Sequence, residues 1–463
     1  MTKKYFAIIK KMEAAPLSAT GVKKGYSELG IGFKANPIVD SEHEDRPRLT
    51  NVSGYTVRSP TVAELYEVLE LPKTGIPLGY VEYNGHKLLF GYPMDPPGWN
   101  QSILCLGVQG KGKSNLIKLL TMGLATTPLL KKQDRPAILI IDHENEYTKF
   151  TAKSQMSYEG KKFVETHGYH NVKPVVYSIH NDSAKSTATL SLRAIDPKEL
   201  INLTTEVEAR TESVLRLLIN RVKKQIENEG GAFEINDFRD KLLHENTHSN
   251  LVHIQQRQAI ARAILSPSLE LFDQKGKTPL TPGEILKPGQ VTVIDIHGLD
   301  RNLRRVVTLY LQIMLDQFIL SNKTGINCLS IIDEAEELFT KPTLASPADR
   351  EFVKRINLRM QDIVNRGRKH GYGILLTVHD YAQIDETISN QTNTKIAFGS
   401  SGAEKWIRRF FGSRFVQEIS DLKTGFCRIM IKAVSGKQRN LNVKFKVPFV
   451  GSKKDLPNSL DDL

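Results

Sequence analysis

Residues 107–114 of the chain, which read GVQGKGKS, decide its fold. They fit the phosphate-binding loop pattern G-x-x-x-x-G-K-[ST] at every fixed position. The apolar run 102–106 before the loop indicates a buried strand, and the apolar spacing of 115–120 after it indicates a helix. In a strand–loop–helix of this kind, backbone N–H groups and the helix N-terminus surround a phosphate. The stretch therefore predicts a nucleotide site.

The chemistry of each position in the loop predicts the contacts with the nucleotide. Lys113 is expected to reach the β- and γ-phosphates, and the hydroxyl of Ser114 is expected to hold Mg²⁺. The glycines let backbone N–H groups turn inward around a phosphate. The candidates for binding the nucleotide in this segment are Gly107, Gly110, Lys111, Gly112, Lys113, Ser114 and Asn115.

The composition of the chain sets limits on its partners and its compartment. The chain has 463 residues, with 64 Lys and Arg against 51 Asp and Glu, so its formal net charge is +13. This balance permits a polyanionic partner. No apolar run approaches the ~20 residues of a membrane span, and the first residues are charged too early for a signal peptide. Cys105, Cys328 and Cys427 lie in apolar runs, which favours buried thiols. We expect a cytoplasmic protein without an integral membrane segment.

The first part of the chain, residues 1–95, differs in pattern from the rest and predicts a small, mostly β, barrel-like N-terminal domain. Residues 81–89 predict a hairpin with an Asn-Gly type I′ turn. Thr61 and Glu64 form the capping box of a helix that begins at about Val62. The proline-rich stretch 93–98 predicts a rigid linker at the end of this domain.

Residues 96–455 alternate between strand and helix patterns and predict an α/β fold with a mainly parallel sheet. Fully apolar strands of this kind belong to a sheet that is covered on both faces. Residues 197–270 predict a helical insertion, with one long helix at 200–226 and another at 251–265. Two further strands are expected at 426–431 and 441–445, and the polar end 456–463 predicts a disordered tail.

An acidic pair, Asp333 and Glu334, follows the apolar strand 328–332. Asp333 is expected to support the Mg²⁺ shell, and Glu334 stands where a base could orient or deprotonate an attacking water. The alternative is a solvated helix start, because Glu336 and Glu337 follow and acids favour a helix N-terminus. The fully apolar strand before the pair favours Mg²⁺ chemistry.

Four further residues have both a functional and a structural interpretation, and the sequence alone does not decide between the two. Arg366 and Arg368 are candidates for an arginine finger that reaches a neighbouring subunit, or they are a basic helix C-terminus. His379, at the end of the strand 374–378, is a sensor for the γ-phosphate or a polar strand end. Asp142 lies at a carboxyl strand end where ligands bind, or it caps a turn.

These motifs, in this order, resemble those of the HerA family within the HerA/FtsK class of hexameric motor ATPases, from about residue 78 to 449. Five segments carry the resemblance: Gly107–Asn115, Ile141–Tyr147 with its "D-x-x-x-E-Y" signature, Val293–Asp300 with Arg304 and Arg305, Ile332–Ala335, and Gly367–Gly371 with its "G-R-K-x-G" element. The family usually has Gln where this chain has His379.

The resemblance implies a RecA-like P-loop ATPase that forms a homohexamer, binds ATP and Mg²⁺, and moves double-stranded DNA through its channel. It implies Lys113 and Ser114 on ATP–Mg²⁺, Glu334 as the catalytic base, and Arg366 or Arg368 as the finger. It also implies that residues 1–95 form the family's β-barrel and that a nuclease is a possible partner.

The sequence is compatible with functions of three different classes. The first is an ATP-driven DNA translocase for end processing, packaging or transfer. The second is a protein-export or assembly ATPase of the conjugation type, which would not respond to DNA. The third is a regulatory ATP-binding module. DNA contacts would be made to phosphates, through basic clusters such as Arg408-Arg409 or segments such as 148–172 and 336–347.

Overall fold

The computed structural model describes the strands 5–14 and 31–40, and residues 61–94, 101–179, 187–321, 325–400, 402–432 and 441–451, apart from 73, 84, 206, 208 and 232. Contacts divide the chain into two units, Met1–Lys73 and Thr74–Leu463. The predicted tail 456–463 and most of the predicted linker 93–98 lie outside the described residues.

The described residues of the smaller unit form an antiparallel strand pair and a helix. Strand β1 (Tyr5–Ala14) pairs with β2 (Ile31–Asp40). Helix α1 (Val62–Val68) begins with the predicted capping box. The Thr61 hydroxyl accepts from the Glu64 N–H at 3.3 Å, and the Glu64 carboxylate accepts from the Thr61 N–H at 2.9 Å. This reciprocal pair satisfies two N–H groups that the first helical turn leaves free.

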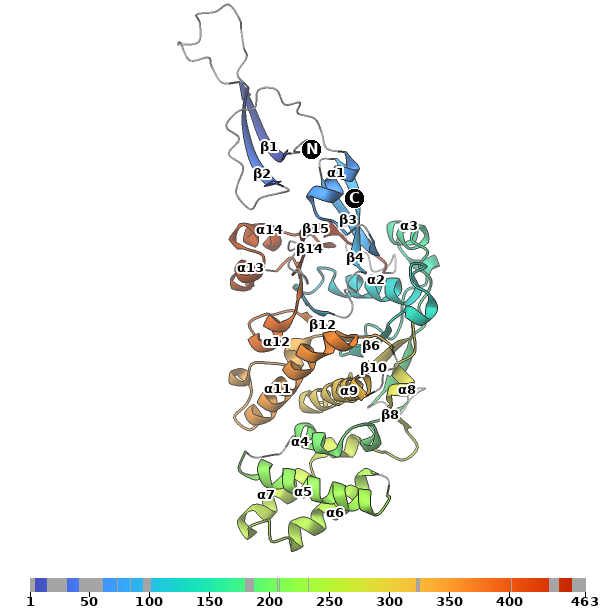
Figure 1. The fold of residues 1–463 in the computed structure, drawn as a ribbon, viewed down its shortest axis with the longest axis vertical. Coiled ribbons are helices and arrows are strands. Elements are labelled where there is room, and N and C mark those ends of the chain that lie inside the picture. Colours follow the sequence, from blue (N-terminus) through green and yellow to red (C-terminus); the bar gives the residue numbers. More distant parts are fainter. Residues whose placement is uncertain are drawn as a thin grey trace, which may run out of the picture. The chain divides into compact units, whose positions relative to one another are not determined.

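The larger unit is built on an eleven-stranded sheet in the described residues (Figure 1), with the order β4-β3-β15-β14-β13-β5-β12-β11-β6-β10-β7. From β13 to β7 all neighbours are parallel, whereas β14, β15, β3 and β4 pair antiparallel. Its strands are β3 (Gly75–Tyr83), β4 (His86–Pro93), β5 (Ser102–Leu106), β6 (Ala137–Asp142), β7 (Val175–Ser178), β10 (Val291–Asp295), β11 (Cys328–Ile332), β12 (Tyr372–Val378), β13 (Thr394–Phe398), β14 (Phe426–Ile431) and β15 (Leu441–Lys446). The predicted α/β fold with a mainly parallel sheet is confirmed.

The helices of this unit connect the strands and pack on the sheet and on one another. They are α2 (Lys113–Thr126), α3 (Tyr158–Thr166), α4 (Leu200–Leu203), α5 (Ala209–Asn228), α6 (Ile235–His248), α7 (Ile254–Ile264), α8 (Pro282–Ile285), α9 (Arg301–Ser321), α10 (Ala335–Leu338), α11 (Arg350–Gly367), α12 (Glu386–Gln391), α13 (Glu404–Phe410) and α14 (Val416–Ser420). Helix α2 packs on β3 and β6, and α11 packs on β12 and α9. Every residue of β5, β6, β11, β12 and β13 is buried, as expected for strands covered on both faces.

The helical insertion is more divided than its hydrophobic pattern predicts. The prediction of one helix over 200–226 is wrong, because α4 ends at Leu203 and α5 begins at Ala209. Thr204 is extended, with φ −89° and ψ 122°, and its carbonyl accepts from the buried guanidinium of Arg355 at 3.0 Å. The same guanidinium binds the Val207 carbonyl at 3.2 Å, so α11 satisfies carbonyls that the interrupted helix leaves free.

The rest of the insertion is a separate group of helices. The helix predicted at 251–265 is α7, while α6 was not predicted. Helices α5, α6 and α7 contact one another, and Figure 1 shows them in green as a group beside α4. A short parallel pair, β8 (Ala188–Thr189) with β9 (Thr278–Pro279), flanks this region.

The predicted hairpin at 81–89 belongs to β3 and β4, with Tyr83 opposite His86. Strand β3 also pairs with β15 through Tyr80 and Lys446, so the hairpin extends the main sheet. The division by contacts therefore falls at Lys73 and Thr74, ahead of the predicted limit at residue 95. The reading of 1–95 as a barrel-like domain stays a prediction. Among the described helices, none has the length and apolarity that crossing a membrane requires.

Candidate nucleotide-binding and hydrolytic site

The glycine loop joins the end of β5 to the start of α2 in the conformation that the motif predicts. Gly110 and Gly112 have φ of +75° and +110°, which residues with a side chain rarely adopt. A Cβ atom on Gly110 would meet nothing within 4 Å, so the loop backbone is open to a ligand there. A Cβ on Gly107 would lie 2.6 Å from the Cβ of Phe398, so this glycine lets β5 leave the sheet beside β13. The segment fits a phosphate cradle at the N-terminus of a fourteen-residue helix.

The ammonium group of Lys113 lies over this loop. Its Nζ donates to the carbonyls of Gly107 at 2.5 Å and Val108 at 3.3 Å, and it lies 2.9 Å from Nδ1 of His379. The side chain is buried, and burial lowers the pKa of the amine. A bound phosphate would favour the charged form of the lysine, because an adjacent anion offsets the loss of solvation. Contact of Lys113 with the β- and γ-phosphates stays a prediction, and its ammonium group lies over the loop that would hold them.

Sheet register brings the predicted polar residues to one edge. Ile332 of β11 pairs with Leu376 of β12 and with Ile141 of β6, and Val378 of β12 pairs with Leu106 of β5. Four parallel strands therefore end side by side. The residues that follow these ends, Asp333, His379 and Gly107, and the last residue of β6, Asp142, share the edge at which open α/β sheets bind ligands.

The acidic pair after β11 is held by Thr377, on the neighbouring strand. Glu334 has a left-handed backbone, with φ +48°, and its N–H donates to the Thr377 hydroxyl at 2.9 Å. That hydroxyl donates in turn to the carboxylate of Asp333. Burial, followed by neighbouring acids, raises the pKa of Asp333 to about 6. A buried carboxyl among other acids fits a divalent cation, so Ser114 and Asp333 are the residues that would hold Mg²⁺.

The carboxylate of Glu334 lies between two imidazoles. Its Oε1 is 3.2 Å from Nε2 of His379, and its Oε2 is 2.8 Å from Nδ1 of His143. Hydrogen bonds from His143 and His379 hold the pKa of Glu334 well below its usual range. The ammonium of Lys113 faces Nδ1 of His379, which leaves the Nε2–H of the same ring to donate to Glu334. The hydrogen bond to Glu334 also raises the pKa of His379.

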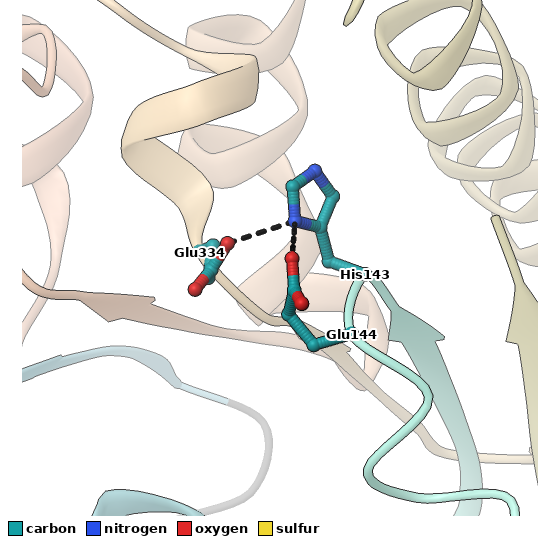
Figure 2. A group of neighbouring side chains, drawn as sticks. All are labelled: His143, Glu144 and Glu334. Atoms are coloured by element: carbon teal, nitrogen blue, oxygen red, sulfur yellow. Dashed lines mark hydrogen bonds and ion pairs between the residues drawn. The ribbon is translucent and has the colours of Figure 1, made fainter. Parts of the chain in front are cut away.

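His143 and Arg304 were not predicted as parts of this site. His143 is buried, and its Nε2 contacts the guanidinium of Arg304 from the first turn of α9. Figure 2 shows the carboxylates of Glu144 and Glu334 near the same ring nitrogen, Nδ1. The only signals in the sequence were the position of His143 after the strand end at Asp142 and the presence of Arg304 in a family-like segment.

The atoms of His143, Glu144 and Glu334 that could bind a metal lie within 4.8 Å of one another. The guanidinium of Arg304 against the same imidazole places a positive charge beside them. We therefore interpret this group as a hydrogen-bonded chain in which Arg304 donates to His143 and His143 donates to Glu334.

The structure contradicts the alternative that Glu336 belongs to a solvated helix start. Glu336 is buried, and its Oε1 accepts from the backbone N–H groups of His379 at 2.6 Å and Asp380 at 3.4 Å. Burial raises the pKa of this carboxyl. Glu336 therefore fixes the backbone that carries His379.

Asp142 and Asn115, which were predicted to bind the nucleotide, make other interactions in the structure. The carboxylate of Asp142 is fully buried and accepts from the N–H groups of Glu146 at 3.0 Å and Tyr147 at 2.8 Å, which is the turn-capping alternative. The amide of Asn115 binds the carbonyl of Pro448 at 2.9 Å and the N–H of Val450 at 2.8 Å, at the C-terminal end of the described chain. Contacts of these residues with a nucleotide stay predictions.

Arg366 lies far from the loop of its own chain. It is near the end of α11, which precedes β12, whereas the loop follows β5 at the opposite edge. The seven residues of β12 separate the two edges by roughly 20 Å. The half-exposed guanidinium of Arg366 binds the buried Asp316 at 2.9 Å. Arg368 follows in a short 3₁₀ turn, Arg368–His370.

Comparison with protein families identifies the central part of the chain. Residues 94–314 match the family described as the central domain of the helicase HerA. Residues 94–314 form a HerA-like central domain. That match includes the glycine loop, His143 and Arg304. No curated protein sequence matches this chain.

Solved structures that are similar to this chain show its fold. The unbound bacterial conjugative coupling protein TrwBΔN70 has a TM-score of 0.55 at 14% identity, over 86% of this chain and 95% of that one. TrwB in complex with ADP and Mg²⁺ has a TM-score of 0.55 at 15% identity, covering 85% and 93%. VirB4 of Thermoanaerobacter pseudethanolicus has a TM-score of 0.52 at 13% identity, covering 81% and 96%. The chain has a TrwB-like P-loop NTPase fold.

Proposed function

We propose that this chain is a ring-forming ATPase that moves double-stranded DNA. The observation that carries the ATPase part is the connection from Lys113 through His379 to Glu334. It links the phosphate loop to an ionised carboxylate at the end of a neighbouring strand. A positioned carboxylate of this kind can accept a proton from an attacking water.

ATP would lie with its β- and γ-phosphates on the loop, and Mg²⁺ would neutralise charge on their oxygens. Lys113 would exchange its bonds to Gly107 and Val108 for phosphate oxygens. When the phosphate takes the ammonium group, Nδ1 of His379 loses its donor. The ring is then free to turn its Nε2–H towards the γ-phosphate, and Oε1 of Glu334 is released for the water. ATP binding would thus convert a held carboxylate into an available base.

Action in a ring is supported by the position of the arginine candidates. Arg366 stands at the sheet edge opposite its own loop, so it can serve only the nucleotide of a neighbouring subunit. A ring of six subunits, and a nuclease as a partner, are what the resemblance to the family implies. The proposal of DNA as the cargo rests on the HerA match and on the net charge of +13.

The test is steady-state ATP hydrolysis with and without linear duplex DNA, at low and moderate salt, beside a Lys113→Ala control. We expect DNA to stimulate hydrolysis and the stimulation to fade as salt rises, because phosphate contacts are screened. Hydrolysis that ignores DNA at every salt concentration would replace this proposal with a protein-export or assembly ATPase. Nucleotide binding with negligible turnover would indicate a regulatory module.

A further inference from the structure

A polar cavity lies between α12, α13, β14 and β15. It has a volume of about 560 Å³, within the range of sites that hold a small ligand or part of a large one. Its polar and aromatic lining includes Asn390, Arg409, Phe410, Arg414, Lys432 and Asn442. None of its described lining residues is acidic.

The cavity stands at the edge of the sheet opposite the glycine loop. Thr394, the first residue of β13, pairs with Ile103 near the start of β5 and with Ile431 at the end of β14. Lys432 follows, and its N–H binds the carbonyl of Asn393 at 3.2 Å. The loop begins after the other end of β5, about 15 Å away along that strand. This cavity is therefore separate from the nucleotide site.

Positive charge is concentrated around one aromatic ring of the cavity, that of Phe410. The distances from its centre are 4.7 Å to the Lys395 ammonium, 5.5 Å to the Arg409 guanidinium and 5.9 Å to the Lys432 ammonium. Such cation–π contacts hold the cations in place without neutralising them.

Little negative charge compensates these cations among the described residues. Arg409 has one distant, exposed partner, Glu386, at 3.8 Å. Lys432 and Arg414 form no ion pair within the described part of the chain, and Arg414 lies 4.5 Å from the ring centre of Phe415. Among the described residues, Lys395 is completely buried and donates only to Thr392. Burial, together with the positive charges of Lys432 and Arg409, lowers the pKa of Lys395 to about 7. A fixed excess of positive charge in a cavity attracts anions.

We infer that this cavity holds the phosphodiester backbone of the DNA that the motor moves, through Arg409, Arg414 and Lys432. The inference rests on the proposed function and names one of its DNA contacts. Arginine and lysine fixed against aromatic rings suit phosphate oxygens, which are the same at every base pair. The contact is therefore independent of sequence, as a translocating protein requires. It also attaches DNA to the edge of the sheet that is remote from hydrolysis.

The test compares two double variants that remove the same charge. Arg414→Gln with Lys432→Gln alters the cavity, whereas Lys354→Gln with Lys405→Gln alters exposed positions of α11 and α13 that do not line it. Affinity for a fluorescent duplex is measured by anisotropy across a salt series. We expect the cavity variant to bind DNA more weakly. The magnitude of its slope of log affinity against log salt should be smaller by about 2, because two phosphate contacts are removed. The control variant should keep the wild-type slope.

A charge-retaining variant and two measurements without DNA serve as further controls. Arg414→Lys with Lys432→Arg retains both charges and should bind DNA as the wild type does. Melting temperature and ATP hydrolysis without DNA should be the same in all four proteins, because none of these residues touches the nucleotide site.

Each outcome separates the inference from the proposed function. Wild-type protein that neither binds duplex DNA nor responds to it would overturn both. Wild-type binding with equal slopes in the cavity and control variants would overturn the cavity contact alone and leave the DNA motor standing. Loss of binding in the charge-retaining variant would show that shape rather than charge matters, which also contradicts the inference.

Discussion

The Nε2 atom of His379 lies 3.2 Å from Oε1 of Glu334, and Nδ1 of the same ring lies 2.9 Å from Nζ of Lys113. One imidazole thus spans the phosphate loop and the carboxylate that we assign as the base. This relationship determines what should happen when His379 is replaced. Gln carries one acceptor and one donor, as neutral His does, whereas Ala carries neither. We expect His379→Gln to retain hydrolysis within several-fold and His379→Ala to lose about 10²-fold.

Steady-state ATP turnover checks this prediction. Asp380→Asn, an exposed change in the same loop, is the matched control and should hydrolyse ATP as the wild type does. Equal losses in the Gln and Ala variants would mean that the imidazole itself, rather than its donor and acceptor, is needed.

Replacement of the proposed base gives the most direct test of hydrolysis. Glu334→Gln should bind ATP–Mg²⁺ normally and hydrolyse it at least ~10²-fold more slowly, because an amide cannot accept the proton of water. Turnover is measured together with binding of a fluorescent ATP analogue. Unchanged turnover would remove Glu334 from the mechanism.

His143 positions Glu334, and two substitutions separate its hydrogen bond from its bulk. The amide nitrogen of Asn can replace Nδ1 as the donor to Oε2 of Glu334, whereas Ala cannot. We expect His143→Ala to lower kcat about tenfold with little change in KM, and His143→Asn to retain more of the kcat. A purely structural role would lower the melting temperature of both variants and would not discriminate between them in kcat.

The arginine finger can be tested by mixing inactive subunits. Arg366→Ala subunits keep the loop, and Lys113→Ala subunits keep the arginine, so mixed rings contain some complete sites. We expect ATP hydrolysis to recover on mixing if Arg366 acts on a neighbour. The same experiment with Arg368→Ala decides between the two arginines.

Arg359→Ala is the control for this mixing experiment, because Arg359 lies 3.9 Å from Asp316, the partner of Arg366, but is mostly buried. Mixing Arg359→Ala with Lys113→Ala subunits should only dilute the activity. If neither Arg366→Ala nor Arg368→Ala recovers activity in verified mixed rings, the finger assignment is wrong.

Lys395 makes the stability of the fold depend on pH. Burial lowers its pKa from 10.5 to about 7, so between these values the unfolded chain binds more protons than the folded one. Stability therefore rises with pH across this window and is lowest below it. Lys395→Met removes the buried charge and should raise the melting temperature at about pH 7. The gain should shrink at about pH 9, where the folded wild type already holds a neutral amine.

Melting temperatures of the wild type and Lys395→Met across this range check the prediction. A difference between the two proteins that does not vary with pH would mean that Lys395 does not titrate in this window.

The sequence alone was sufficient for the features that local pattern determines. The glycine loop between an apolar run and a helical pattern predicted β5, Gly107–Ser114 and α2, because the motif and its flanks are contiguous. Fully apolar runs predicted buried parallel strands, and Asp142, Asp333 and His379 were predicted at or directly after their ends. Parallel register brings such strand ends to one edge of the sheet.

Tertiary structure decided which side chains surround Glu334 and which interactions the predicted residues make. His143 is 191 positions from Glu334 in the chain, and Arg304 is 161 positions from His143, so no local pattern reports their contact. The break between α4 and α5 likewise depends on Arg355, from a distant helix.

The basic cavity at the other edge of the sheet could not be predicted from local sequence pattern either. It forms where the ends of α12 and α13 meet the ends of paired β13, β14 and β15. In the sequence, Arg409 belongs to one basic pair among several, and Arg414 and Lys432 belong to no basic cluster. Only strand pairing places them around one cavity, because hydrogen-bond register rather than sequence distance fixes which strand ends are neighbours. The sequence thus determined the chemistry available to this protein, and the fold decided where that chemistry is concentrated.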